Sequence, residues 1–506
     1  MRNLLILFFC VLAPAGRCWA APQTNEDWAS TRNEETGQTT LAMTLTLHGA
    51  AAPIPALKYR FIPDEFEQRE GNAAIYYLRA MGFLEQNAAR DQLSKVWDKA
   101  REEAASKGVG FNDLPPYTWL ETPPDKLPID EVKKYLQLTS FQPRDLAVAR
   151  KLKDFDLDRN VRDVDSPIMI LLPEIQTMRE LARNQSLRCR VAIAENRFKD
   201  AFEIIGQQYA LAHHLSEEPF LVSNLVGAAV ASIAYTDGLY LAQMPSAKNL
   251  YWAYAALPNP IIDIKKSLGF ERQLLFLEVK PLAEIDEKPR PAGYWSDFID
   301  RVIPRYAPIM DGLRIDTEIL SEVGRMAVVS AIGASYPGAK RYLLDEIGMD
   351  AELVESYPTA QVVFLAQKRF YERFRDEHFK WFFVEESLRS GVDEYQTVDQ
   401  RMERQAAKVG WAAYPATQLL PAIRAANNAV QRMQLNVSML QTVEAIRMYA
   451  AGHNGELPAN LSELPYPAPA NPFTGKPIQY EQTDGAATLI ADAANLTYKL
   501  TIRIAE

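Results

Sequence analysis

The sequence predicts a mainly α-helical protein, an irregular multi-helix array that carries a small β-meander at its C-terminus. From about residue 70 to 450, apolar residues recur at intervals of three and four, which is the period of helices that bury one face. Near the end, alternate residues of the segment 497–504 are apolar, as in a half-buried strand. Residues 478–481 and 487–491 are expected to form the other strands of the meander.

A further strand is expected near the N-terminus, over residues 41–47. Apolar side chains alternate there with threonine or alanine, at Leu41, Met43, Leu45 and Leu47. A short meander has exposed edges and is marginal on its own. We therefore predict that residues 41–47 join the C-terminal strands in one sheet, which would bring the two ends of the chain together.

Three segments of the helical region are distinctive. Residues 187–214 predict a helical hairpin, in which Phe198, Ala201 and Ile205 fit the pattern of a tetratricopeptide-like (TPR-like) unit. Residues 221–241 are apolar and rich in alanine and glycine, which predicts a buried helix with close neighbours. Residues 358–389 predict one aromatic-rich helix, whose rings are expected to lie in the core.

The first twenty residues have the features of a secretory signal peptide. Arg2 is followed by an apolar run over residues 4–13 and by Cys18-Trp19-Ala20, a small-x-small cleavage pattern. The apolar run is half of the roughly 20 residues that cross a bilayer as a helix. We therefore expect an exported protein, periplasmic or extracellular, with no stable membrane span after the signal is cleaved.

Charge and cysteine content limit the class of protein further. The net charge is −10, and loss of Arg2 and Arg17 with the signal lowers it to −12. Nucleic acid requires clustered Lys and Arg, so we expect no nucleic-acid partner. The mature chain would keep only Cys189, which lies in an apolar helical pattern. We expect a small buried side chain there and no internal disulfide.

Polarity, proline and charge divide the chain into regions. Residues 21–38 predict a flexible tail, and residues 39–285 the N-terminal strand and a first helical region. The charged and proline-broken segment 286–293 is a candidate hinge. A second helical region follows over residues 294–429, and residues 430–506 contain the last helix and the small sheet.

No catalytic or cofactor-binding motif is evident, and we expect neither a cofactor nor a metal. The weak candidates for a metal site lie near the end of one predicted helix, where a four-residue spacing places them pairwise on shared faces: His213, His214, Glu217 and Glu218. No third ligand can be placed beside either pair. Residues 154–165 imitate a calcium loop, but Arg159 stands where the loop needs glycine.

The segment 249–263 is the most unusual internal string. Its candidate binding residues combine aromatic and polar side chains: Tyr251, Trp252, Tyr254, Asn259 and Asp263. Aromatic residues beside proline-rich turns also pack in cores. The string therefore predicts either a binding surface or a helix end locked to its neighbours.

Residues 430–481 resemble the globular part of type II secretion major pseudopilins. The resemblance rests on Tyr449, Asn454-Gly455, Pro458 and the run from Asn471-Pro472 through Gly475 to Tyr480. The processed N-terminal helix of that family, with its glutamate, is missing here, and Asn471 stands in place of the usual aspartate. The resemblance implies a long helix, a punctuated loop and a small sheet in an extracytoplasmic setting.

Almost the whole mature chain is also similar to a large uncharacterised family of exported bacterial helical proteins. The segments that carry this similarity are residues 56–60, 71–74, 249–253, 257–263 and 379–382. The similarity implies location and architecture and no particular reaction.

Three functions remain open at this point. Export, an acidic chain and irregular helical hairpins without catalytic motifs favour a non-enzymatic extracytoplasmic scaffold or binding protein, with a protein partner in the cell envelope. One alternative is an envelope enzyme, such as a carboxylate-based hydrolase. The other is an accessory protein that docks to a secretion apparatus through its C-terminal module. Paired carboxylates in a deep pocket would favour the enzyme, and a broad groove would favour the scaffold.

Overall fold

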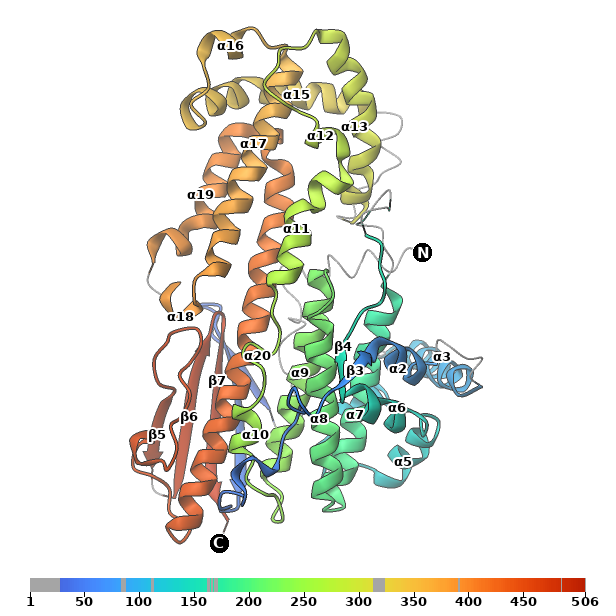
Figure 1. Ribbon diagram of the computed structural model, residues 1–506, viewed down its shortest axis with the longest axis vertical. Helices are drawn as coiled ribbons and strands as arrows, with labels where there is room; N and C mark the ends of the chain where they lie inside the picture. The colour runs from blue at the N-terminus through green and yellow to red at the C-terminus, as the bar shows by residue number, and fades with distance from the viewer. Residues whose placement is uncertain are drawn as a thin grey trace.

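The computed structural model describes residues 28–82, 88–110, 113–161, 164, 167, 172–312, 324–389, 392–483 and 485–505. The expected signal peptide, residues 1–20, lies outside the described residues, as does most of the expected tail. The described chain is mainly α-helical and elongated, with a sheet beside one end of its longest helix (Figure 1).

A five-stranded sheet joins the two ends of the described chain, in the order β1-β2-β7-β6-β5. Its strands are β1 (Ala29–Arg32), β2 (Thr39–Leu47), β5 (Gln479–Thr483), β6 (Ala486–Ala493) and β7 (Leu496–Ile504). β2 runs parallel to β7 with Met43 opposite Leu500, and the other pairs are antiparallel. The prediction that residues 41–47 join the C-terminal strands is therefore confirmed. Part of the segment expected to be a flexible tail, residues 29–32, forms the edge strand β1 instead.

One face of the sheet lies against the helices. Alternate side chains of β2, β6 and β7 are buried, among them Leu45, Leu489 and Leu500. Trp28, just before β1, is also buried and packs its ring against Tyr235 and Tyr498, with ring centres 6.4 Å apart in both cases. Apolar burial therefore fixes the register of the strands, because a shift of one residue would turn each buried side chain outward.

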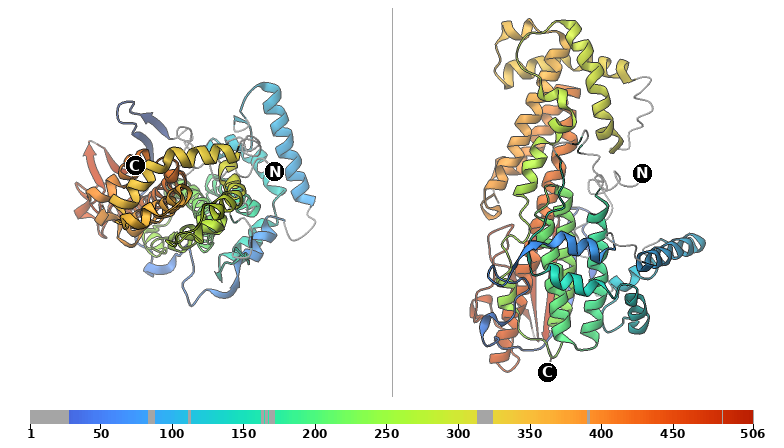
Figure 2. Two further views of the ribbon diagram at one scale, coloured as in Figure 1. Left: turned by 90° about the horizontal axis from the view of Figure 1, so that it is seen from above. Right: turned by 45° about the vertical axis from the view of Figure 1, so that its right-hand side comes forward.

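A group of shorter elements covers one side of the molecule. Its helices are α2 (Ala73–Ala80), α3 (Ala88–Lys107), α4 (Tyr117–Glu121), α5 (Ile129–Gln137) and α6 (Gln142–Ala149), and its two strands are β3 (Arg69–Asn72) and β4 (Leu152–Asp154). α3 projects away from the body (Figure 2). β3 and β4 form a separate parallel pair.

Three long helices form the centre of this half: α7 (Pro173–Ala194), α8 (Phe198–Leu215) and α9 (Leu221–Ala242). α7 and α8 form the predicted TPR-like hairpin, with Asn196 in the left-handed conformation at the turn and Ala201 fully buried at the crossing. Cys189 is buried, as expected. By length and composition α9 could cross a membrane, but 89% of its most apolar window is buried inside the protein.

The chain then crosses to the other half of the molecule and returns. The helices are α10 (Tyr251–Ala255), α11 (Lys265–Glu278), α12 (Lys280–Ala283), α13 (Ala292–Gly312), α15 (Gly324–Arg341), α16 (Ala351–Glu355), α17 (Thr359–Phe379), α18 (Glu386–Arg389), α19 (Asp393–Val409) and α20 (Tyr414–Gly452). α20 runs back along most of the molecule and packs on α9, α10, α17 and β6 (Figure 1). The boundary expected at residue 430 falls inside this continuous helix.

The single helix expected over residues 358–389 is wrong. α17 ends at Phe379, a 3-10 turn covers Lys380–Phe383, and Val384 is extended before α18. Arg389 donates two hydrogen bonds to the Val384 carbonyl, at 2.8 and 2.6 Å. That carbonyl would bond a backbone N–H in a continued helix, so the arginine stabilises the break.

The candidate hinge over residues 286–293 lies against α17 and is bonded to it at several points. The Gln361 side chain accepts from the backbone N–H of Arg290 at 3.1 Å and donates to the Lys288 carbonyl at 2.8 Å. Tyr357 donates to the Glu287 carbonyl at 2.5 Å. These bonds fix the path of the segment in this structure.

A buried ion pair on α20 joins three distant parts of the chain. Glu444 and Arg447 are each 1% exposed and lie 2.9 Å apart. Arg447 also donates to the His48 carbonyl, just after β2, and to the Ala247 carbonyl after α9, at 3.1 and 2.9 Å. Glu444 accepts from the backbone N–H of Leu250 at 3.1 Å. The pair therefore ties α20 to the exit of β2 and to the segment before α10.

Asn249 completes this network. Its amide donates to the Ala50 and Glu444 carbonyls, at 3.2 and 2.7 Å, and accepts from the backbone N–H of Tyr251 at 3.1 Å. Burial raises the pKa of Glu444, and the charge of Arg447 opposes that effect. Each buried charge in this cluster thus depends on the other for its stabilisation.

We predict that Arg447→Met destabilises the protein by about 3–5 kcal/mol, because it leaves the Glu444 carboxylate buried without a cation. Urea unfolding followed by circular dichroism measures the change. The double variant Glu444→Gln/Arg447→Met should lose less than the sum of the two single variants. Lys107→Met, which breaks an exposed pair with Glu103, should leave stability close to that of the wild type. Equal losses of stability in Arg447→Met and Lys107→Met would contradict the conclusion that the buried pair holds the fold together.

Candidate functional site

Four segments that are far apart in the sequence enclose a cleft of about 660 Å³, which we call the α20 cleft. They are residues 254–265 between α10 and α11, residues 382–389 after α17, one face of α20 over residues 427–441, and residues 469–475 before the sheet. Ligand pockets in proteins typically measure about 300–1,000 Å³. The α20 cleft is therefore large enough for a ligand.

The α20 wall is polar and uncharged. Its polar side chains recur at intervals of four and three residues, at Asn427, Gln431, Gln434, Ser438 and Gln441. This spacing keeps them on one face of the helix, with a drift of only about 20° per heptad. Val430 and Val437 lie between them and line the same face. The carbonyl oxygen of the Gln434 side chain has no hydrogen-bond partner.

The opposite wall consists of two loops that are rich in proline. Pro258 and Pro260 lie on the first, and Pro469 and Pro472 on the second. Asn471 fixes the second loop, since its amide donates to the Asp492 carbonyl of β6 at 2.9 Å and accepts from the backbone N–H two residues on at 2.8 Å. The sheet thus positions this wall against α20.

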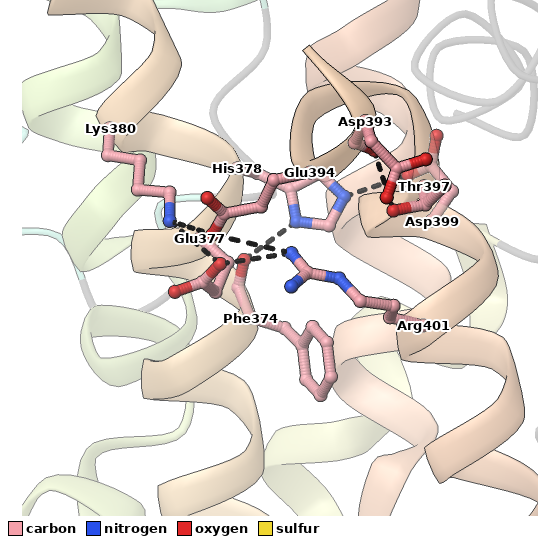
Figure 3. A network of polar contacts seen from close by, with 9 residues as sticks. All are labelled: Phe374, Glu377, His378, Lys380, Asp393, Glu394, Thr397, Asp399 and Arg401. Carbon is pink, nitrogen blue, oxygen red and sulfur yellow. Dashed lines mark hydrogen bonds and ion pairs between the residues drawn. The ribbon is translucent and has the colours of Figure 1, made fainter.

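The third wall depends on a hydrogen-bonded histidine at the end of α17 (Figure 3). His378 is buried, with its Nδ1 2.7 Å from the Phe374 carbonyl and its Nε2 2.8 Å from the Asp399 carboxylate of α19. The ring therefore links α17 to α19. Arg424 of α20 binds the second oxygen of Asp399. The cluster therefore joins α17, α19 and α20.

The charge of this cluster favours the ionised carboxylate. Burial alone would raise the pKa of Asp399, but the hydrogen bond from His378 and the charge of Arg424 hold it below its ordinary value. A narrow cavity of about 20 Å³ beside His378 shares Phe382, Arg389 and Asn427 with the α20 cleft. The cluster thus supports the cleft wall from behind.

A second set of ion pairs holds the α17 end against α19 (Figure 3). Lys380 lies 2.9 Å from Glu377 and 2.5 Å from Glu394, and Arg401 lies 3.1 Å from Glu377. Single exposed pairs of this kind contribute little, about 0–1 kcal/mol. Together they restrict the direction in which residues 380–389 leave the helix.

Segment 382–389 consequently presents apolar side chains to solvent. The Arg389 guanidinium lies over the Phe382 ring at 5.7 Å and over the Tyr395 ring at 5.8 Å, which fixes the turn. Phe383, which lines the cleft, remains 78% exposed, and Leu388 remains 66% exposed. Large exposed apolar side chains beside a cleft are typical of binding surfaces.

The carboxyl groups with raised pKa values lie elsewhere. In the described part of the chain, burial raises the pKa of Glu218, Asp237, Glu271 and Glu444, that of Glu271 to about 7. None of these four lines the α20 cleft, whose acidic lining residues are Asp263 and Glu385. The paired, perturbed carboxylates that a hydrolase would need are therefore not seen among the described lining residues.

The structure divides the predicted binding residues into two groups. Tyr251 is buried, stacks on Tyr466 and donates to a backbone carbonyl, and Trp252 packs edge-on against the same ring. Tyr254 is buried with its ring 4.8 Å from that of Phe61, and it also borders the cleft. The first half of the string therefore packs in the interior.

The second half of the string lines the cleft. Asn259 and Asp263 are exposed and belong to the cleft wall. Asp263 accepts from the backbone N–H of Lys265 at 3.0 Å, which shapes the start of α11. Two of the predicted binding residues, Asn259 and Asp263, thus line the α20 cleft, and the aromatic residues before them position the segment.

The weak metal candidates each have a protein partner. His214 contacts the Tyr77 hydroxyl and the Leu152 carbonyl, and His213 contacts the Ile261 carbonyl. Lys266 pairs with Glu217 and Arg159 with Glu218, at 3.2 and 2.9 Å. Among the described residues, no group of three or more His, Cys, Asp or Glu side chains is arranged to hold a metal ion.

Sequence analysis missed the amide-rich face of α20 and the segment 382–389. Apolar periodicity was sufficient to predict the helix, but the alternation of Asn and Gln at intervals of four and three residues was the signal for its second, polar face. Nothing in the local sequence indicated that Phe383 would be exposed, because the break after α17 depends on contacts with α19 and α20.

A second hollow, of about 550 Å³, lies over α5, α7 and α8. Polar side chains on its wall bind one another, as Arg197 does Asp200, and Gln185 donates to Gln207 at 2.5 Å. Because these groups already have partners, the α20 cleft is the stronger candidate.

No protein-family model, curated protein or solved structure matches the chain at a significant level.

The buried His214 predicts a pH dependence of stability. Burial lowers its pKa from 6.5 to about 4, so the unfolded chain binds this proton at a higher pH than the folded chain does. Stability should therefore fall as pH drops from about 6.5 to 4, by up to about 3 kcal/mol from this group alone. His214→Gln, measured by urea unfolding across this range, should remove that part of the slope. His453→Gln, which replaces an exposed histidine, should show the same loss of stability as the wild type. If His214→Gln still lost stability to the same extent, the pH dependence could not come from His214.

Glu271 predicts a dependence of the opposite sign. Burial raises its pKa from 4.5 to about 7, so the folded chain keeps a proton that the unfolded chain has lost. The wild-type protein should lose stability from this group as pH rises from 4.5 to 7, and Glu271→Gln should be more stable than wild type above pH 7, by up to about 3 kcal/mol. The exposed control Glu70→Gln should show no such gain. An unchanged or lower stability of Glu271→Gln at high pH would be inconsistent with a protonated, structural carboxyl.

Proposed function

We propose that this protein is a non-enzymatic extracytoplasmic binding protein whose ligand site is the α20 cleft. The observation that carries the proposal is the convergence on one cleft of segments that are remote in sequence. Residues 257–263, 382–389 and 469–475 meet the polar face of α20 there. Two of the strings that carry the similarity to exported bacterial proteins, 257–263 and 379–382, contribute residues to its walls. The pseudopilin-like run that begins at Asn471 also contributes residues.

The geometry favours binding over catalysis. The lining residues combine amide side chains, which both donate and accept, with exposed apolar surface at Phe383. Amide and phenyl groups recognise a ligand without supplying a proton or a nucleophile at neutral pH, and the two carboxyl groups of the lining, Asp263 and Glu385, are exposed. The carboxyls with raised pKa values, such as Glu271 and Asp237, are buried outside the cleft.

Docking to a secretion apparatus has a different structural requirement. A C-terminal module that docks by itself would need to be separable, but α20 packs on α9, α10 and α17 as well as on β6. Deletion of residues 430–506 would remove half of this helix and the Glu444–Arg447 pair. A test of docking therefore has to use surface substitutions in the intact chain.

We predict that a photo-crosslinker at the cleft captures the ligand. The full chain carries p-benzoylphenylalanine at Phe383 in the cells that produce the protein, and irradiated adducts are identified by mass spectrometry. The matched control places the same residue at Phe66, which is 99% exposed and does not line the cleft. An adduct that forms at residue 383 and not at residue 66 is expected.

The nature of the adduct decides between the three functions. A small molecule or polymer that the purified protein binds but does not convert supports the binding protein. Conversion of the captured compound by the purified protein would establish the enzyme instead. A single envelope protein captured in stoichiometric amounts would favour docking, and equal labelling at residues 383 and 66 would exclude the cleft as the site.

A further inference from the structure

The chemistry of the α20 cleft defines a class of ligand, on the basis of the function proposed above. We infer that the cleft binds an uncharged, β-linked glycan chain that lies along α20. Four features of the cleft lead to this assignment. They are the spacing of its amide side chains, the proline-rich facing loops, the exposed Phe383 ring at its rim and the zero net charge of its lining.

The polar face of α20 matches an extended ligand with repeating hydroxyl groups. From residue 427 to 441 the helix rises by about 21 Å, at 1.5 Å per residue. Gln431, Gln434 and Gln441 are half-exposed on this face. Each amide offers two donors and an acceptor, and a sugar hydroxyl can both donate and accept. Gln431 and Gln441 offer such groups to the cleft, whereas the unpartnered carbonyl oxygen of Gln434 is buried.

The interval between the amide groups agrees better with sugar units than with a peptide. The partly exposed amides Gln431, Gln434 and Gln441 span about 15 Å along the helix, which is three intervals of about 5 Å, whereas Asn427 and Ser438 on the same face are buried. An extended peptide presents the same edge every two residues, which is about 6.6 Å. One pyranose unit of a β-linked chain is close to the shorter value, so sugar units remain in step with the polar face of α20.

The facing loops are poorly suited to holding a peptide backbone. Peptides that add to a sheet use free backbone N–H and C=O groups of an edge strand. None of the described lining residues belongs to a strand, and four of those on the facing loops are prolines, which have no N–H: Pro258, Pro260, Pro469 and Pro472. Recognition on this side therefore depends on apolar surface and on the side chains of Asn259, Asp263 and Lys265, which suits the C–H faces and hydroxyl edges of sugar rings.

The aromatic rim supplies a flat surface for a sugar ring. Phe383 lines the cleft and is 78% exposed, and the half-buried Phe382 lies next to it. Burial of exposed apolar surface is favourable, and an exposed phenyl ring gains this contribution only when a ligand covers it. The apolar C–H face of a pyranose ring has the shape and polarity to do so.

The charged side chains that line the cleft sum to a net charge of zero, and Asp263 and Arg389 are hydrogen-bonded within the protein. Asp263 and Glu385 carry negative charge, and Lys265 and Arg389 carry positive charge. Arg389 donates to the Val384 carbonyl and packs on Phe382. A net charge of zero at the lining offers little electrostatic attraction to a charged polymer, so the ligand is assigned as neutral.

The test is isothermal titration calorimetry of the full mature chain with tetramers of β-linked glucose and of β-linked N-acetylglucosamine. An extended, uncharged octapeptide is the comparison ligand. At least one glycan is expected to bind. Gln431→Ala and Gln434→Ala are each expected to weaken binding about tenfold, because each removes a partly exposed amide side chain from the cleft wall. Phe383→Ala is exposed enough to leave folding intact and should weaken binding to a similar extent.

The matched control is Asn428→Ala, which removes a half-buried amide of α20 that does not line the cleft. It should bind as wild type does, and circular dichroism of every variant verifies folding. Binding of the octapeptide with the same sensitivity to the variants, and no glycan binding, would overturn the glycan assignment and leave the proposed function intact. Glycan binding that none of the cleft variants weakens would also overturn the assignment. If neither ligand class binds and the crosslinker at residue 383 captures nothing, the proposed function fails as well.

Discussion

The buried pair of Glu444 and Arg447 is the constraint on which the rest of the structure depends. It couples the middle of α20 to the residues that follow β2 and to the segment that precedes α10. The sheet, the central helices and the wall of the α20 cleft are therefore positioned relative to one another by the same ion pair. Two charges without solvent in the interior are stable only with complete hydrogen bonding, so small displacements of any of these elements are costly. The pair also positions one wall of the cleft, because residues 254–265 follow closely after residues 247–250, which are bonded to Glu444 and Arg447.

The α20 cleft differs from the core in the way its side chains are held. The walls consist of residues that are positioned by neighbours behind them: Asn471 by β6, Arg389 by two aromatic rings, and residues 382–389 by the His378–Asp399–Arg424 cluster. Supporting contacts of this kind keep polar lining groups at fixed distances before a ligand arrives. A preorganised site loses less conformational freedom on binding than one that has to form around its ligand.

Sequence patterns were sufficient for the helices and for the pairing of the two chain ends, because both follow from the periodicity of apolar residues. Residues 41–47 could be assigned to the C-terminal sheet since a half-buried strand needs a neighbour. The break after Phe379 was not predicted, because the bonds from Arg389 to the Val384 carbonyl and from His378 to Asp399 of α19 form only in the folded chain. The different roles of Tyr251 and Asn259 also depend on contacts that form only on folding. Tyr251 packs against Tyr466, whereas Asn259 lines the cleft. The strand β1 was missed because its short polar sequence has no apolar alternation and relies on β2 for its hydrogen bonds.

The parallel pairing of β2 with β7 has a consequence for the order of folding. β7 lies in the middle of the sheet, between a strand from the start of the described chain and a strand that immediately precedes it. Until the last strand is available, β2 has an unpaired edge and an apolar face, which is the arrangement that promotes intermolecular strand pairing. More than 450 residues separate the paired positions, so this contact is among the slowest to form by chain diffusion. The sheet is therefore complete only after the C-terminal residues have been synthesised, and until then β2 lacks its partner strand.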